Sequence, residues 1–350
     1  MNCSDSHNQL ARSAFAGEAS CGLSDEVDGD PPSSTPELSI ICVNWNSLDL
    51  LLDCLESLYA LPTGTTFETL VVDNASPEGG IEVVGERFPQ VRIIKSPTNV
   101  GFAKANNLGF LNSSGRYVLL LNPDTLVLGS AIATMLDAIQ SIGDAGIVGG
   151  MLLNTDLSVS TTSIQKFPTI LNQVLTFEWL RVHFPNCPLW EIGPLFSATV
   201  GPVKVDVIPG ACMMLKREVY ERAGMLSEDY FMYAEDIDLN FRVRQLNLSS
   251  YYVGSAKIVH HGGRSSSKQG GSQWSTVRTC RAMMQLFRTH RGSMYARAYR
   301  AALGCTAAMR LIALAAIYPL GDRDGVRGSV AKWSTVLKWS LGIEQLGAGQ

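Results

Sequence analysis

The sequence lacks the short motifs that mark several large classes of protein. No Gly-x-Gly-x-x-Gly follows its first apolar run, no P-loop occurs, and no segment repeats with a period of roughly 20–50 residues. A dinucleotide-binding oxidoreductase therefore loses its main support, and solenoids and propellers are excluded. The chain has 350 residues, of which 46% are hydrophobic and 17% charged. This length and composition are typical of a globular α/β enzyme.

Paired cysteines and a secretory signal are also missing. None of the eight cysteines forms a Cys-x-x-Cys pair, and Cys42 and Cys212 lie inside apolar runs, where a thiol is simply a small buried side chain. The first 30 residues contain no apolar run of the kind that a secretory signal needs. We therefore expect reduced thiols and a cytoplasmic location.

Charge is distributed unevenly along the chain, although the net charge is only −4. Residues 1–36 hold one base and six acids and are rich in Ser, Asp and Gly, which predicts a disordered acidic arm. Residues 264–350 hold 13 bases and three acids, a net charge of +10. A basic C-terminal quarter of this kind indicates an anionic partner.

Short apolar runs alternate with helix-length segments from residue 38 onward. The runs cover residues 38–43, 69–72, 91–94 and 117–121, and the helical patterns cover about 48–58, 79–88 and 102–112. This alternation predicts a parallel sheet covered by helices on both faces. Ligands of such sheets bind beyond the carboxyl ends of the strands, so we expect Asn44, Asp73, Ser96 and Asn122–Asp124 along one edge.

The pattern changes after residue 155. Residues 155–200 are irregular and contain four prolines among scattered aromatic residues, which is typical of a substrate-binding insertion. The elements expected beyond them are strands over 203–208, 212–215 and 251–259, a helix over 235–246, and helices from about 272 to the end.

The tripeptide Asn122-Pro123-Asp124 directly follows a predicted strand. A carboxylate at the end of a strand can reach a metal ion bound to a diphosphate, which is the usual way that proteins hold Mg²⁺. A turn that only reverses the chain explains the same residues. The tripeptide alone leaves both interpretations open.

Two further polar groups lie near the ends of predicted elements. Glu235-Asp236-Ile237-Asp238 opens a predicted helix behind the aromatic run 230–233. Acids in a first turn are favoured by the helix dipole, but adjacent acids behind an aromatic wall also suit a general base. His260 ends a predicted strand, where it either makes ordinary hydrogen bonds or joins a distant Asp as a metal ligand.

Seven blocks of sequence, in a fixed order, carry a resemblance to a known family. They are Ser39–Asn46, Val71–Ser76, Asn99–Asn107, Leu121–Asp124, Pro209–Cys212, Phe231–Leu239 and His260–Ser265. Through these blocks residues 38–265 resemble the family 2 inverting glycosyltransferases, especially the rhamnosyltransferase-like branch. The resemblance implies the GT-A fold, an α/β nucleotide-diphospho-sugar transferase fold with a mostly parallel sheet flanked by helices. We expect an acidic arm over 1–36, a catalytic domain over 37–265 and a basic helical extension over 266–350.

The resemblance implies a role for each matching residue. Asp236 would be the general base, Asp124 the metal-binding acid of a D-x-D motif, and His260 a further ligand of Mg²⁺ or Mn²⁺. The residues assigned to the nucleotide sugar are Asn44, Asp73, Asn99, Gly101, Asn106, Asn122 and Asp124. Those placed near the acceptor or behind the catalytic residues are Glu235, Asp238 and His261.

One residue departs from the family pattern. Asn122 stands where D-x-D has its first acid, so the metal is expected to be held more weakly, although the rhamnosyltransferase-like branch carries the same Asn-Pro-Asp. The implied reaction is a direct displacement that inverts the anomeric centre. In it Asp236 accepts the proton of the acceptor hydroxyl, and the metal offsets the charge of the nucleotide diphosphate.

Two classes of function remain open. The first is an active glycosyltransferase of cell-surface polysaccharide synthesis, with a dTDP- or UDP-linked donor such as dTDP-rhamnose and a glycan or polyprenyl-diphosphate-linked acceptor. The second is an inactive nucleotide-sugar-binding or scaffolding protein, which the presence of Asp124, Asp236 and His260 disfavours. A processive synthase is disfavoured because the sequence lacks a Q-x-x-R-W motif and several transmembrane spans.

The basic extension has its own alternatives. Arg278, Arg281, Arg288 and Arg291 fall within about 140° of one another on a helix. The segment 301–320 is apolar except for Arg310, which would cost about 2.5–3.5 kcal/mol at the centre of a bilayer. Helices lying on the cytoplasmic face of an anionic membrane fit this pattern, and so does packing on the catalytic domain or a homodimer interface. No nucleic-acid partner is expected, because no recognition module accompanies the charge.

Overall fold

The computed structural model describes residues 35–60, 64–160, 162–175, 201–262, 264–317 and 323–343. The predicted acidic arm lies outside these ranges apart from its last two residues, as does the second half of the irregular segment. Residues Pro36–Gln350 form one unit, distinct from Met1–Thr35. The description below concerns the described part of that larger unit.

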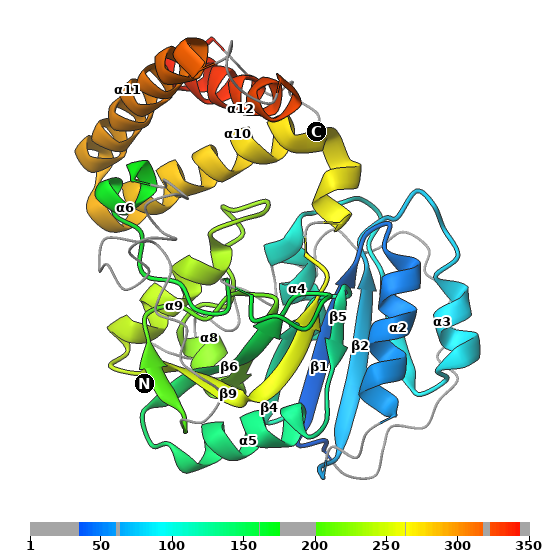
Figure 1. The fold of residues 1–350 in the computed structure, drawn as a ribbon. Coiled ribbons are helices and arrows are strands. Elements are labelled where there is room, and N and C mark those ends of the chain that lie inside the picture. The colour runs from blue at the N-terminus through cyan, green and yellow to red at the C-terminus, as the bar shows by residue number, and fades with distance from the viewer. Residues whose placement is uncertain are drawn as a thin grey trace. The chain divides into compact units, whose positions relative to one another are not determined.

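The centre of the fold is a sheet whose strands follow the order β3-β2-β1-β4-β8-β6-β9-β5, with β7 paired to β9 (Figure 1). Their bounds are β1 Leu38–Asn44, β2 Phe67–Asp73, β3 Val91–Lys95, β4 Tyr117–Leu121, β5 Thr125–Val127, β6 Ala145–Leu153, β7 Val203–Val205, β8 Cys212–Lys216 and β9 Ser249–His260. The strands β3, β2, β1 and β4 are parallel, as are β6 and β9. Antiparallel pairs join β8 to β4 and β6, and β5 and β7 to β9. The sheet is thus mostly parallel, with antiparallel strands that the sequence pattern did not predict.

The register of the parallel strands aligns their carboxyl ends. Asn44 of β1 pairs with Asp73 of β2, and Asp73 pairs with Lys95 of β3. The backbone N–H of Ser96 donates to the carbonyl of Asp73 at 2.9 Å. Because β1 and β4 are also in parallel register, Asn122 follows β4 at the same edge. The predicted gathering of polar residues at one edge of the sheet is confirmed.

Helices cover both faces of the sheet (Figure 1). Those of the sheet region are α2 Leu48–Tyr59, α3 Glu82–Arg87, α4 Phe102–Leu111, α5 Ala131–Ser141, α8 Arg217–Arg222 and α9 Glu235–Gln245, whereas the short helix α6 Ile170–Val174 lies against the C-terminal helices. Three longer helices follow, α10 Arg264–Arg291, α11 Ser293–Ile317 and α12 Arg323–Leu341. The C-terminal helices are confirmed, and α10 begins before the predicted start near residue 272.

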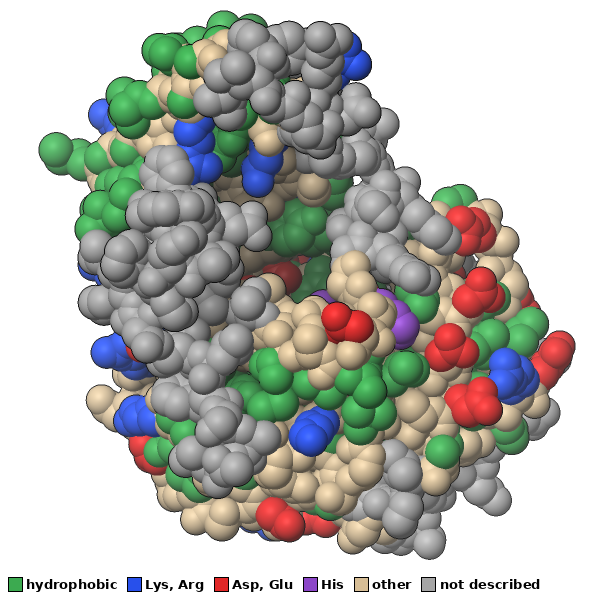
Figure 2. Space-filling model, viewed as in Figure 1, with side chains coloured by type: hydrophobic (Ala, Val, Ile, Leu, Met, Phe, Trp, Pro, Cys, Tyr) green, Lys and Arg blue, Asp and Glu red, His purple; other side chains and the backbone are tan. Residues whose placement is uncertain are grey.

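The helices α10, α11 and α12 share a core of their own that also reaches the sheet region. It joins Phe287, Tyr299 and Trp339 to Tyr230 and Ile237, which lie beside and within α9. Figure 2 shows hydrophobic and cationic side chains over these three helices, whereas acidic side chains lie over the sheet region. No helix in the described ranges has both the length and the apolar character needed to cross a membrane.

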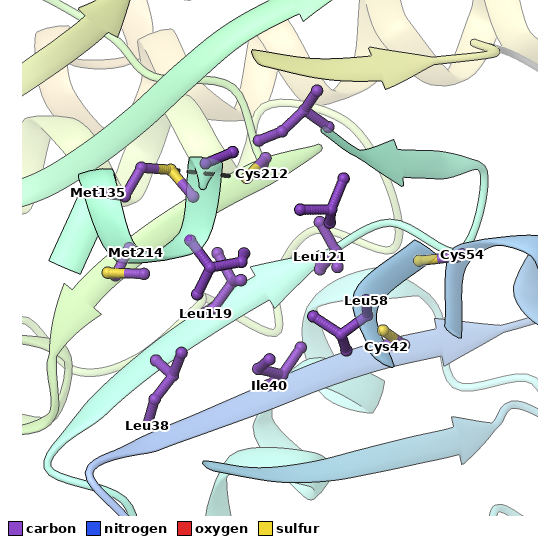
Figure 3. Packing of buried hydrophobic residues seen from close by; sticks show 14 of the residues in the cluster. Leu38, Ile40, Cys42, Cys54, Leu58, Leu119, Leu121, Met135, Cys212 and Met214 are labelled. Atoms are coloured by element: carbon purple, nitrogen blue, oxygen red, sulfur yellow. Dashed lines mark hydrogen bonds between the residues drawn. The ribbon is translucent and has the colours of Figure 1, made fainter. Parts of the chain in front are cut away.

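Two cores lie on opposite faces of the sheet because neighbouring residues of a strand point in opposite directions. Ile40 and Leu119 enter the core beneath α2 and α5, which Figure 3 shows with Leu58 and Met135. The adjacent residues Ile41 and Leu120 enter the other core, beneath α4, α8 and α9. Fully burying each such side chain contributes about 1.5–3 kcal/mol, so the strands are fixed from both sides.

Candidate active site

A cavity of about 340 Å³ lies beyond the carboxyl ends of β1 and β4. It brings together residues from β1, β6 and β9, the loop that follows β4, the first turns of α4 and α9, and the irregular segment. Figure 2 shows this face hollowed between the C-terminal helices and the sheet region, with acidic and histidine side chains nearby. The predicted site residues that line the cavity are Asn99, Gly101, Asn122, Asp124, Glu235, Asp236 and His260.

Asp124 and His260 form a close pair in this cavity. His260 Nε2 lies 3.3 Å from Asp124 Oδ1. Strand pairing explains the contact, because β5 follows Asp124 directly and its first residue, Thr125, pairs with His260 of β9. The pairing of β5 with β9 therefore brings Asp124 and His260 together, although they lie far apart in the sequence.

The same corner fits a divalent cation that shares its ligands with a substrate. Asn122 Oδ1 is buried without a hydrogen-bond partner among the described residues, so it is an acceptor that a cation or its bound water would satisfy. The described residues contain no group of three or more His, Cys, Asp or Glu side chains that could hold a metal alone. Asp124 and His260 would thus need oxygens of a diphosphate to complete the coordination, as Mg²⁺ sites usually do.

Asp236 is held rigidly at the start of α9. Its Oδ2 accepts the backbone N–H of Gly210 at 2.9 Å, and its Oδ1 accepts the N–H of Ile237 at 2.8 Å. Burial raises the pKa of Asp236, while these backbone hydrogen bonds act in the opposite direction. A carboxylate that is fixed in position and more basic than usual suits a general base.

Glu235 lies beside Asp236 but in a drier environment. Its side chain is buried, and Oε2 has no hydrogen-bond partner within the part of the chain that the structure describes. Burial raises the pKa of Glu235 well above its ordinary range, and the negative charge of Asp236 raises it further. The two adjacent carboxyl groups therefore differ in protonation, with the proton retained on Glu235 to higher pH.

This difference predicts a pH-dependent stability. An unfolded Glu ionises near pH 4.3, about the ordinary value, whereas folded Glu235 keeps its proton to higher pH. Between pH 4.3, about the ordinary value, and the higher pKa of folded Glu235, the unfolded state binds fewer protons than the folded state. The free energy of unfolding therefore falls as the pH rises through this range. We expect Glu235→Gln, which cannot ionise, to unfold at a higher temperature than the wild type at pH 7.5, with the gap closing near pH 4. Thermal unfolding across this range measures it, with the exposed Glu86→Gln as control. A gap that does not change with pH would contradict the assignment.

Asp238 points away from the cavity, although it belongs to the same helix. Its Oδ1 lies 2.6 Å from His290 Nε2 of α10, and its Oδ2 accepts a hydrogen bond from Arg242 Nε at 2.7 Å. The Asp238 side chain is only 3% exposed. This buried network attaches α9 to the C-terminal helices, so Asp238 lies behind Asp236 and away from the space that an acceptor would enter.

Asn74 organises the loop that precedes α4. Its Nδ2 donates to Asn99 Oδ1 at 3.0 Å and to the Gly101 carbonyl at 3.3 Å, and its Oδ1 accepts the N–H of Val100 at 2.9 Å. Gly101 has a φ of +85°, and a Cβ there would collide with the carbonyl oxygen of Phe231. Glycine is therefore required where this loop touches the aromatic segment before α9.

Besides Asp238, four predicted residues are not among the described residues that line the cavity. Asn44 Nδ2 donates to Asp73 Oδ1 at 3.0 Å, just beneath the edge of the sheet. Asn106 Nδ2 donates to the Phe102 carbonyl within α4. His261 donates its backbone N–H to the Asp124 carbonyl at 2.9 Å. Contacts of Asn44, Asp73 and Asn106 with a nucleotide, and of His261 with an acceptor, stay predictions.

The cavity also contains residues outside the predicted set. Trp45 and Asn74 come from blocks that the sequence analysis had singled out for their neighbours Asn44 and Asp73. Thr162 and Gln165 come from the irregular segment, whose substrate-binding role stays a prediction. Gln165 is placed by an isolated antiparallel bridge to Val207, just beyond β7.

Comparison with known proteins places this site in a family context. Residues 39–224, about half of the chain, match the family model for "Glycosyl transferase family 2". The N-acetylglucosaminyl-diphospho-decaprenol L-rhamnosyltransferase of Mycobacterium tuberculosis is 28% identical over 255 residues, which cover 68% of this chain and 80% of that protein. The rhamnosyltransferase WbbL of Escherichia coli K12 is 26% identical over 168 residues, covering 46% of this chain and 61% of that protein.

A solved structure has the same fold. The mannosyltransferase PcManGT from Pyrobaculum calidifontis, in complex with GDP-Man and Mn²⁺, superimposes with a TM-score of 0.54 over 92% of this chain and 91% of that chain. The sequence identity is 18%, so the likeness concerns the fold alone. It agrees with the GT-A fold that the resemblance implied.

Proposed function

The chain belongs to glycosyl transferase family 2, and from this premise we propose that it transfers rhamnose from a nucleotide diphosphate to an acceptor hydroxyl, with inversion at the anomeric carbon. The observation that carries the proposal is the convergence of Asp236 with the Asp124–His260 pair on one cavity at the carboxyl edge of the sheet. A base for the acceptor and a cation-binding pair for the leaving group are the two parts that a direct displacement needs.

Asp236 acts on the acceptor in this proposal. The acceptor oxygen forms a bond to the anomeric carbon, its proton passes to a carboxylate oxygen of Asp236, and the bond from that carbon to the diphosphate breaks. The hydrogen bonds from Gly210 and Ile237 aim the carboxylate before substrate binds, which lowers the cost of orienting it. Since no covalent nucleophile takes part, one displacement inverts the configuration.

Asp124 and His260 would hold Mg²⁺ or Mn²⁺, with Asn122 supplying a neutral oxygen. When bound, such an ion offsets the negative charge that grows on the departing diphosphate. Asn122 brings no charge of its own, so the protein offers one carboxylate and one imidazole. We therefore expect metal and nucleotide diphosphate to bind interdependently, because the diphosphate supplies oxygen ligands to the metal and the metal offsets the negative charge of the diphosphate.

The donor and acceptor follow from the relatives. The relative from M. tuberculosis is named for L-rhamnosyl transfer to N-acetylglucosaminyl-diphospho-decaprenol. We propose a dTDP- or UDP-linked rhamnose as donor and a polyprenyl-diphosphate-linked glycan as acceptor. The reaction would then take place at the cytoplasmic face of a membrane, during synthesis of a cell-surface polysaccharide.

A donor panel tests this proposal. We expect dTDP-L-rhamnose or UDP-L-rhamnose to raise the unfolding temperature of the purified protein when Mg²⁺ or Mn²⁺ is present, and to raise it much less with EDTA. GDP-mannose and CMP-sialic acid serve as mismatched donors. If GDP-mannose alone stabilises the protein, the proposed donor is wrong. If no nucleotide sugar stabilises it, the proposed function is contradicted.

A further inference from the structure

One side of α11 exposes an almost purely apolar surface. The residues that form it are Met294, Ala298, Ala301, Cys305, Met309, Ile312 and Ala316, all of them exposed. Their spacing of three or four places them within about 80° of one another on a helix. Met294 is 82% exposed, Ile312 72% and Met309 63%. We call this surface the α11 apolar face.

The α11 apolar face is not a packing surface of the described chain. The residues of α11 that pack against α10 and α12 are others, including Ala296, Tyr299, Leu303 and Ala307. The contacts with the rest of the described chain also use other residues: His290 of α10 contacts Asp238, and the hydroxyl of Tyr295 in α11 accepts a hydrogen bond from the backbone N–H of Ile170 in α6. Figure 1 shows α11 on the outer side of the three helices, and Figure 2 shows hydrophobic side chains gathered at that margin.

The charged side chains of α10 and α11 are all basic. The sequence from Arg264 to Gly321 contains no Asp or Glu. Arg297 borders the α11 apolar face, and Arg288, Arg291, Lys332 and Lys338 are exposed on α10 and α12. The occupant of the surface must therefore tolerate apolar contact and carry negative charge.

From this combination we propose that the α11 apolar face docks on an anionic lipid bilayer, with Arg297 at its border and the other basic residues of the C-terminal helices attracted to the lipid phosphates. An amphipathic helix of this kind lies in the interface with its apolar side among the upper acyl chains. A second copy of the chain fits less well, because two surfaces that carry only cations repel each other. The contact is peripheral, since no described helix could span the bilayer.

This docking deepens the proposed function, because it would bring the enzyme to a lipid-linked acceptor. It does not depend on the donor or on the chemistry. The stability of the C-terminal helices and the nucleotide response of the cavity can both be measured without a membrane. The two proposals can therefore fail separately.

Vesicle flotation tests the docking surface. We expect the full chain to float with vesicles of phosphatidylglycerol and phosphatidylcholine at low salt, to float poorly with phosphatidylcholine alone, and to be largely released by 1 M NaCl. The double variant Met309→Glu/Ile312→Glu places two acids on exposed positions and should bind at least about tenfold more weakly. Leu157→Glu changes a residue that is 62% exposed outside these helices, and should bind like the wild type.

A fluorophore reports whether the face itself enters the bilayer. Cys305 is exposed, whereas the other described cysteines are buried, so a chain with Cys3, Cys21 and Cys187 changed to serine can be labelled at Cys305. An environment-sensitive dye there should shift to the blue with anionic vesicles.

Four results would overturn the proposal. They are no flotation of the wild type with anionic vesicles, equal binding by the double variant, no shift of the dye, and a dimer in sedimentation that the double variant abolishes. The double variant should keep the wild-type unfolding temperature and its increase with nucleotide sugar. If no nucleotide sugar stabilises either protein while flotation behaves as expected, the proposed function fails and the docking stands.

Discussion

Asp236→Asn is expected to bind the nucleotide-sugar donor nearly as well as the wild type and to transfer sugar about 10²–10⁴ times more slowly. The amide cannot accept a proton at neutral pH, so the acceptor hydroxyl loses its base. The donor keeps its contacts, because Asp124, His260 and the loop at Asn99–Gly101 are unchanged. Steady-state transfer and donor-induced thermal stabilisation, measured side by side, separate the two effects.

The hydrogen bonds of Asp236 add a second expectation for this variant. Both carboxylate oxygens accept backbone N–H groups, from Gly210 and Ile237, and an amide has only one acceptor oxygen. One N–H is left without a partner, which costs about 1–3 kcal/mol of stability. The variant should therefore melt at a lower temperature, and rates must be compared where it is fully folded.

Asp238→Asn is the matched control for Asp236→Asn. It makes the same chemical change on the same helix, but Asp238 faces His290 and Arg242 and does not line the cavity. We expect it to lose stability and to keep most of its turnover per folded molecule. If Asp236→Asn transfers sugar at the wild-type rate, or if Glu235→Gln binds donor normally and fails to transfer, Asp236 is not the base.

Asp124→Ala is expected to abolish turnover and to remove most of the metal-dependent stabilisation by a nucleotide diphosphate. Asp124 supplies the carboxylate beside His260, and a lone imidazole offers a divalent cation no negative charge. The unfolding temperature with dTDP or UDP, measured with Mg²⁺, Mn²⁺ or EDTA, gives a readout that does not depend on transfer.

Two comparison variants sharpen this second test. Asn122→Asp restores the first acid of D-x-D next to Asp124, so it should increase the metal-dependent stabilisation. Asp156→Ala removes an exposed carboxylate outside the cavity and should leave it unchanged. Metal-dependent stabilisation of Asp124→Ala equal to that of the wild type would remove Asp124 from the site.

The parallel half of the sheet could be predicted because its strands are buried on both faces. β1 and β4 are apolar along nearly their whole length, and a run of that kind is visible in sequence; the antiparallel strand β8 shows the same run. The direction of β8 could not be predicted, since an apolar run does not specify whether its neighbours are parallel or antiparallel. The polar edge was predicted correctly because it depends only on where β1, β2, β3 and β4 end.

Residues 125–153 contain a helical pattern of apolar residues that our sequence analysis did not identify. In α5 the residues Ile132, Met135, Leu136 and Ile139 are buried, which is the three-and-four spacing of an amphipathic helix. β6 is harder to recognise, because Gly146, Gly149 and Gly150 interrupt its apolar residues. A Cβ at Gly149 would collide with Ile208, so these glycines serve close packing inside the sheet.

The sequence predicted which blocks of residues contribute to the site, but it did not predict the contacts between individual residues. On α9, two residues apart in the sequence, Asp236 and Asp238 point to different sides of the helix, but the sequence does not say which of them faces the cavity. That choice is made by His290, which lies 52 residues beyond Asp238 in the sequence and binds it from α10. Likewise, the contact of Gly101 with Phe231 joins two loops that no local pattern connects.

The most direct test of the proposed reaction is to follow it by NMR. Purified protein would be incubated with dTDP-L-rhamnose, Mg²⁺ and an N-acetylglucosaminyl polyprenyl diphosphate, and the anomeric configuration of the first product would be recorded alongside that made by Asp236→Asn. We expect transfer to the acceptor with the configuration opposite to that of the donor, and almost no product from the variant. A product that retains the donor configuration, or donor binding without transfer to any glycan or lipid-linked acceptor, would contradict an inverting glycosyltransferase that uses Asp236 as its base.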